Sequence, residues 1–128
     1  MGTVLQGGKI ITASNIFDAD IRIEGEVISD IGLDVMQSGD EVIDVSGCLI
    51  FPGGIDVHTH FDLDVGFTTT SDNFETGTKA AIHGGTTTII NYATQYKGET
   101  LKQAFENEFN KAQTCYCDFG IHMGITDW

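Results

Sequence analysis

Two residue rhythms alternate through the second part of the chain, and this alternation most strongly limits its possible folds. The runs GGIDVHTH (53–60), TTTIINYA (86–93) and DFGIHMGIT (118–126) have the β-branched or alternating composition of strands. Helical patterns separate these runs, one beginning near Asp72 and one in TLKQAFENEFNKA (100–112). Strand, helix, strand, helix, strand is the opening of a parallel α/β array.

Start and stop signals bound the two predicted helices. Asp72 with Glu75, and Thr100 with Gln103, have capping-box spacing. The sequence HGG at 83–85 is typical of a helix end, where a histidine suits the negative end of the helix dipole. The second helix is predicted to pack through one apolar stripe, made of Leu101, Ala104, Phe105, Phe109 and Ala112.

The first part of the chain has a different pattern. Residues 1–51 contain short alternating segments separated by turns, such as Glu24-Gly25-Glu26 between two β-branched runs. They contain no helical period. We therefore expect two parts: residues 1–51 as a segment of a β-sandwich, and residues 52–128 as the start of an α/β barrel.

Composition narrows the possible partners. Nineteen acidic and six basic residues give a net charge of −13, which repels phosphate groups, so neither nucleic acid nor a membrane is expected as a partner. The N-terminus lacks the pattern of a secretory leader, and no apolar run reaches the ~20 residues that span a bilayer. We expect a cytoplasmic protein whose Cys48, Cys115 and Cys117 are reduced thiols.

The two histidines of the first barrel strand are the main candidates for chemistry. In a strand, residues two apart lie on one face about 6.6 Å apart, so His58 and His60 can converge on one metal ion. They close a strand, and α/β barrels carry their chemistry at the C-terminal ends of strands. The spacing alone leaves a structural role for the pair open.

Longer motifs extend this argument to a family. The run LIFPGGIDVHTHFD (49–62), followed by SDNFETGTKAAIHGGTTTIINY (71–92), resembles the N-terminal part of the amidohydrolase superfamily, most closely the dihydropyrimidinase and D-hydantoinase group. The resemblance covers essentially the whole chain. It implies that the early strands join a C-terminal segment in a β-sandwich, and that the remainder belongs to a (β/α)8 barrel.

The same resemblance implies a metal site. His58 and His60 match the pair that binds the more buried of two metal ions, usually zinc. The other ligands are a carboxylated lysine that bridges both metals, two further histidines and an aspartate, all on later strands outside these 128 residues. The implied activity is hydrolysis of the ring amide of dihydropyrimidines or 5-substituted hydantoins by a metal-bridged hydroxide. A homotetramer is implied for the complete enzyme, and the 128-residue chain alone is predicted to be inactive.

Three related alternatives were weighed. Dihydroorotases carry H-x-H-x-R, whereas this chain has Asp62 at the arginine position, which disfavours a carboxylate substrate. The collapsin response mediator proteins share the fold but lack the metal ligands. An allantoinase-like enzyme stays open, as does a non-catalytic fragment or interaction module with a residual metal pair.

Other residues receive supporting roles. The loop after the histidines departs from the group's usual sequence, and Leu63, Val65 and Phe67 are the expected wall for the substituent on the substrate ring. On alternation alone, Asp56 shares the face of the two histidines. His122 lies between glycines on the third strand, where small neighbours leave room near the barrel interior. Asp56 and His122 are therefore candidates to orient the metal ligands.

Overall fold

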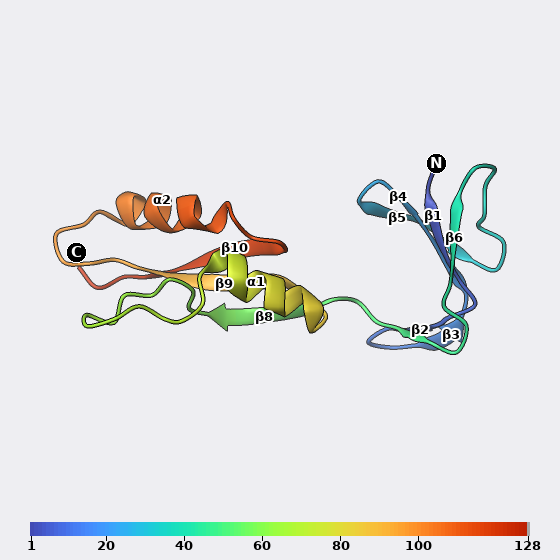
Figure 1. The fold of residues 1–128 in the computed structure, drawn as a ribbon, viewed down its shortest axis with the longest axis horizontal. Coiled ribbons are helices and arrows are strands. Elements are labelled where there is room, and N and C mark those ends of the chain that lie inside the picture. Colours follow the sequence, from blue (N-terminus) through green and yellow to red (C-terminus); the bar gives the residue numbers. More distant parts are fainter. Residues whose placement is uncertain (128) are drawn as a thin grey trace. The chain divides into compact units, whose positions relative to one another are not determined.

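The computed structural model describes residues 1–127, which fall into two compact units, one of residues 1–52 and one that begins at Gly53 (Figure 1). The first unit is all-β, as predicted from its alternating segments. Strands β4, β1 and β6 and strand β5 form one sheet in the order β5-β4-β1-β6, and a second sheet has the order β3-β2-β7. The strands are β1 (Thr3–Gln6), β2 (Lys9–Ile11), β3 (Ile16–Asp18), β4 (Asp20–Glu24), β5 (Val27–Gly32), β6 (Glu41–Asp44) and β7 (Leu49–Ile50).

A small apolar core joins the two sheets of the first unit. Ile10 of β2, Ala19 and Ile21 of β4 are buried together, and Leu5 and Ile50 pack against them. Alternation explains this arrangement, because every second residue of a strand faces the same side. The outer side is less well covered. Val27, Ile28 and Ile31 of β5 are each more than half exposed.

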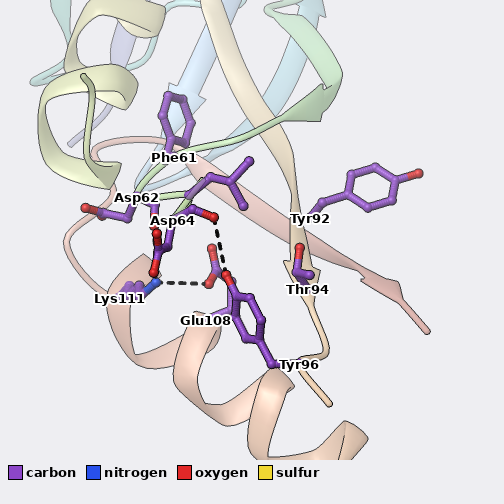
Figure 2. A pocket seen from close by; sticks show the side chains of 9 residues that line it. Phe61, Asp62, Asp64, Tyr92, Thr94, Tyr96, Glu108 and Lys111 are labelled. Atoms are coloured by element: carbon purple, nitrogen blue, oxygen red, sulfur yellow. Dashed lines mark hydrogen bonds and ion pairs between the residues drawn. The ribbon is translucent and has the colours of Figure 1, made fainter. Parts of the chain in front are cut away.

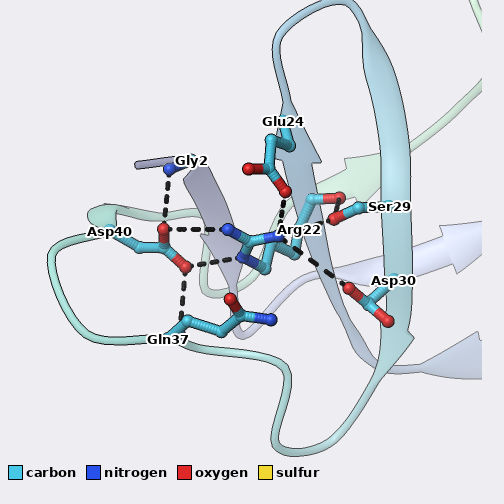
Figure 3. A network of polar contacts seen from close by, with 7 residues as sticks. All are labelled: Gly2, Arg22, Glu24, Ser29, Asp30, Gln37 and Asp40. Atoms are coloured by element: carbon cyan, nitrogen blue, oxygen red, sulfur yellow. Dashed lines mark hydrogen bonds and ion pairs between the residues drawn. The ribbon is translucent and has the colours of Figure 1, made fainter.

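One buried ion pair supports the first unit (Figure 3). The side chains of Arg22 and Asp40 are 3% and 1% exposed, and Arg22 Nε donates to Asp40 Oδ2 over 2.7 Å. Asp40 also accepts hydrogen bonds from the backbone N–H groups of Gly2, at 2.6 Å, and Gln37, at 3.0 Å. The hydrogen bonds from Arg22 and then Gly2 hold the pKa of Asp40 well below its usual range. Asp40 therefore ties β1 and the preceding loop to β4.

The second unit is a parallel sheet covered by two helices. Strands β8 (Gly54–Thr59), β9 (Thr86–Thr94) and β10 (Asp118–Gly124) pair in parallel in the order β10-β9-β8. Helix α1 (Phe74–His83) connects β8 to β9, and α2 (Leu101–Ala112) connects β9 to β10. Neither of these helices is long and apolar enough to cross a membrane. The parallel α/β array predicted from the sequence is confirmed.

The helix boundaries agree with the sequence prediction at three of four ends. Helix α2 starts with the predicted capping box of Thr100 and Gln103, and α1 ends at His83 with Gly84 as its C-cap. The predicted start of α1 is wrong by one residue, because the capping box is formed by Asn73 and Thr76. The neighbouring Asp72 carboxylate accepts a hydrogen bond from the Thr76 hydroxyl, so it supports the cap without being the cap residue.

The core of the second unit lies between the sheet and the helices. Phe74, Ile89 and Ala112 are buried there, with Phe61 and Phe119 among the residues packed against them. The apolar stripe predicted for α2 is only partly right. Its alanines are buried, whereas Leu101, Phe105 and Phe109 are 41%, 42% and 42% exposed. The large residue that α2 buries is the carboxylic acid Glu108, for which the apolar pattern gave no signal.

Candidate metal centre

Two imidazoles converge at the end of β8. His58 lies in the strand and His60 follows its last residue, and their Nε2 atoms are 3.1 Å apart. Two nitrogen ligands at ordinary bond lengths from one tetrahedral zinc ion lie ~3.3 Å apart. The ring planes are inclined at 71°. The pair therefore fits two adjacent positions of a single metal shell.

The remainder of such a shell is not provided by this chain. Among residues 1–127, no three His, Cys, Asp or Glu side chains are grouped closely enough to hold a metal ion. The 3.1 Å separation also permits a hydrogen bond between the rings when one nitrogen is protonated and the other is not. The described residues thus supply half of a four-ligand site.

Strand β8 does not follow an ideal alternating ladder near the histidines. Its register against β9 shifts between Asp56 and Thr59, so the regular alternation from Asp56 to His58 is interrupted. The Asp56 carboxylate accepts a hydrogen bond from the backbone N–H of His58 at 3.1 Å. Asp56 therefore acts on the backbone of the irregular segment in this structure.

A row of aromatic rings runs across the sheet beside the two histidines. The ring centroid of Tyr92 in β9 lies 4.5 Å from that of His58 and 5.7 Å from that of His60. His122 of β10 is the ladder partner of Tyr92, and their rings are 5.1 Å apart. The structure thus places His122 next to Tyr92, which separates it from the histidine pair. Tyr92 was missed in the sequence, although its alternation with Ile90 in TTTIINYA placed it on that face.

The residue after His60 anchors the end of β8 to α1. The ring of Phe61 lies 5.5 Å from that of Phe74, between centroids. A Cβ atom added to Gly77 would lie 2.1 Å from Phe61 Cε1, so only a glycine lets the ring approach the helix this closely. The sequence FETGTKAA therefore contains a seat for the residue next to a candidate ligand.

Replacing Gly77 by alanine should disturb both the fold and the histidine pair. Because the ring has to move away from the new methyl group, we expect the free energy of unfolding to fall by about 1–3 kcal/mol, as for other overpacked cores. Gly84→Ala at the end of the same helix is the matched control, since its Cβ would meet only Ala81 O at 3.4 Å. Urea unfolding of the complete protein measures both, and equal stability of the two variants would contradict the role of this seat.

Asp62 begins the loop that follows the histidines. Its φ is 51°, a left-handed conformation, and its carboxylate accepts a hydrogen bond from the backbone N–H of Phe74 at 3.3 Å. The negative charge is thus directed at the first turn of α1, where the helix dipole favours it. Asp62 has a structural function in addition to replacing the arginine of dihydroorotases.

The three residues predicted to contact substrate lie in a tight hairpin. Backbone hydrogen bonds join Val65 N to Thr68 O and Thr70 N to Leu63 O, both at 2.9 Å. Leu63 is partly buried, whereas Val65 is 45% and Phe67 is 90% exposed. Of the three, Leu63 alone lines the cavity described next.

An open cavity of about 250 Å³ lies between the ends of β8 and β9 and one face of α2 (Figure 2). Asp62, Asp64, Glu108 and Lys111 gather on one side of it, while the ring of Tyr92 points away from them. Lys111 Nζ lies 3.4 Å from Glu108 Oε2. Burial raises the pKa of Glu108, and the charge of Lys111 opposes that effect.

The cysteines do not extend the candidate site. Cys48, Cys115 and Cys117 are free thiols. Burial raises the pKa of Cys115 to about 11, with a further contribution from Cys117. Because metals and electrophiles react with the thiolate, a thiol with this pKa is a poor ligand at neutral pH.

Comparison with known proteins agrees with this arrangement. Residues 49–121 match the model of the amidohydrolase family, so the match includes β8 with both histidines and more than half of the chain. The chain belongs to the amidohydrolase family. It is 48% identical to the D-hydantoinase of Geobacillus stearothermophilus over 128 residues, which cover 99% of this chain and 27% of that protein. It is 37% identical to the dihydropyrimidinase of Rattus norvegicus, covering 98% of this chain and 25% of that protein.

A solved structure extends the comparison to the backbone. The dihydropyrimidinase from Brevibacillus agri NCHU1002 superposes with a TM-score of 0.96 at 43% identity, over 100% of this chain and 28% of that one. The predicted resemblance to the dihydropyrimidinase and D-hydantoinase group is confirmed, and so is the predicted fold class. The chain spans little more than a quarter of the length of these relatives.

Proposed function

We propose that this chain is the N-terminal portion of a metal-dependent cyclic amidohydrolase. Its substrates are dihydropyrimidines or 5-substituted hydantoins, and it hydrolyses the ring amide bond. The observation that carries the proposal is the convergence of His58 and His60, whose Nε2 atoms are 3.1 Å apart at the C-terminal end of a parallel strand. The D-hydantoinase and dihydropyrimidinase names of similar proteins support the substrate class.

The chain's own residues would bind and orient. His58 and His60 would each give one neutral nitrogen to a metal ion, and zinc is our proposal because imidazole suits it in tetrahedral sites. A bound metal ion lowers the pKa of a coordinated water and polarises the amide carbonyl. Tyr92 packs beside His58 and limits the directions that its ring can take. Two ions per subunit, a homotetramer and a cytoplasmic location complete the proposal.

The hairpin after β8 is our proposal for the substituent wall. Leu63 already faces a cavity, and the exposed side chains of Val65 and Phe67 are available to a substrate or to a neighbouring segment. Asp56 and His122 are proposed to orient the ligands, Asp56 through the backbone of His58 and His122 through Tyr92. These contacts would act on specificity and on the geometry of the metal site, without bond making.

The proposal is tested by measuring ring opening in the complete protein that contains this chain. Zinc-loaded enzyme is expected to open dihydrouracil and hydantoin rings, with allantoin as the comparison substrate. A much higher kcat/KM for allantoin would favour the allantoinase-like alternative. Absence of ring opening with all three substrates, in protein that binds two zinc ions per subunit, would support a non-catalytic module and refute the proposed activity.

A further inference from the structure

Two polar side chains are buried in the second unit without a part in the proposed chemistry. Asn91 of β9 is fully buried, and Glu108 of α2 is 8% exposed. Asn91 Nδ2 donates a hydrogen bond to Glu108 Oε1 over 2.7 Å. Burying a carboxylic acid and an amide costs free energy unless their polar atoms are paired. The remaining partners of Asn91 therefore show what this pair stabilises.

The carbonyl oxygen of Asn91 binds the chain on both sides of His60. Asn91 Oδ1 accepts a hydrogen bond from the Thr59 hydroxyl at 3.0 Å and another from the backbone N–H of Phe61 at 2.9 Å. The backbone ladder is irregular here, since the register of β8 against β9 shifts just before Thr59. A side chain thus supplies the contacts that hold this segment to β9.

The orientation of the Asn91 amide follows from its neighbours. The N–H of Phe61 can only donate, so the Asn91 atom that faces it has to be the oxygen. The NH2 group then points to Glu108, whose carboxylate accepts. Lys111 lies 3.4 Å from the other carboxylate oxygen of Glu108, so this acid is paired on both sides. The chain of contacts runs from α2 through β9 to the candidate ligand.

We propose that Asn91 is a positioning residue for His60, which it holds through Thr59 and Phe61, and that Glu108 fixes the direction of the Asn91 amide. The inference rests on the proposed role of His60 as a metal ligand. It assigns a purpose to the burial of Glu108 on a helix that does not carry any candidate ligand. Loss of the amide should act on metal binding, since partners that orient a ligand typically change metal affinity by about 10–100-fold.

An exchange of the two groups tests the proposal. Asn91→Asp places two carboxylates where 2.7 Å now separates an amide nitrogen from a carboxylate oxygen, so zinc affinity of the complete protein should fall by about 10–100-fold. In the double variant Asn91→Asp/Glu108→Gln, the new amide donates to the new carboxylate, which still accepts from Thr59 and Phe61. The double variant should therefore recover the zinc affinity of the wild type. Glu108→Gln alone keeps an acceptor for Asn91 and should bind zinc like the wild type.

Controls separate positioning from a general loss of stability. Gln95 is another buried amide of β9, but it bonds Glu99 O and the N–H of Thr126, away from β8. Gln95→Glu should lower the thermal midpoint and leave zinc affinity unchanged. Zinc dissociation constants come from chelator competition, and the visible spectrum of the cobalt-substituted protein reports the ligand geometry. If Asn91→Asp does not fold, Thr59→Val removes one of the two contacts and should weaken zinc binding to a smaller extent.

The outcomes distinguish this inference from the proposed function. Unchanged zinc affinity in His60→Ala would refute the metal role of His60 and, with it, the role of Asn91. Weakened binding in His60→Ala, combined with wild-type affinity in Asn91→Asp or without recovery in the double variant, would overturn the positioning role alone. Recovery of both affinity and the cobalt spectrum in the double variant is the result we expect.

Discussion

Replacing His60 by alanine in the complete protein should lower kcat/KM for dihydrouracil by at least about 1000-fold. A metal ion contributes several kcal/mol to transition states of this kind, and a loss of ~4 kcal/mol corresponds to that factor. His58→Ala should have an effect of similar size, because both Nε2 atoms face the same point. The measurement is steady-state turnover in zinc-containing buffer.

His83→Ala is the matched control for these two variants. His83 is exposed in the last turn of α1, and it lies on the opposite side of the α1 sequence from the histidine pair. Its removal should leave turnover near the wild-type rate. If His60→Ala retained wild-type turnover as well, the two histidines would be a hydrogen-bonded pair on the strand and not part of the reaction centre.

The isolated 128-residue chain should hydrolyse none of these substrates. The described residues supply two ligands at most, and none of them forms a three-ligand group. Half of a tetrahedral shell binds zinc weakly and activates its water little. Zinc titration by calorimetry and a ring-opening assay of the purified chain measure this, and a rate above that of free zinc, abolished by His58→Ala, would contradict the expectation.

The same isolated chain should also self-associate. Ile55 and Val57 are 65% and 60% exposed on β8, which is an edge strand of its sheet. Val27 and Ile28 of β5, also an edge strand, are 63% and 60% exposed. Open apolar edges favour pairing between chains. Sedimentation velocity over a concentration series should show growing assemblies, whereas a monomer at all concentrations would show that these faces are tolerated.

Local patterns were sufficient to predict the elements of this fold. The cap of α2 and the end of α1 follow from short-range hydrogen bonds of Thr100, Gln103 and Gly84, which depend on residues a few positions apart. The one-residue error at the start of α1 has a simple cause. Asp72 and Asn73 are both good cap residues, and the choice between them depends on the contact of Asp62 with the first turn.

Contacts between distant residues were beyond the reach of these patterns. Glu108 is buried because Asn91, on another element, accepts it as a partner, so the helix pattern alone predicted a stripe of aromatic residues in its place. The register shift in β8 likewise depends on pairing with β9. The sequence predicted that His58 and His60 could converge, while the contribution of Tyr92, Gly77 and Asn91 became visible only once the elements were packed.

X-ray absorption at the zinc edge of the complete protein is the most direct test of the central claim. We predict a first shell that contains imidazole nitrogens in the wild type, and a smaller imidazole contribution with less bound zinc in the His58→Ala/His60→Ala double variant. The His83→Ala protein should give the wild-type spectrum and the wild-type zinc content. An unchanged spectrum and zinc content in the double variant would contradict the assignment of His58 and His60 as metal ligands.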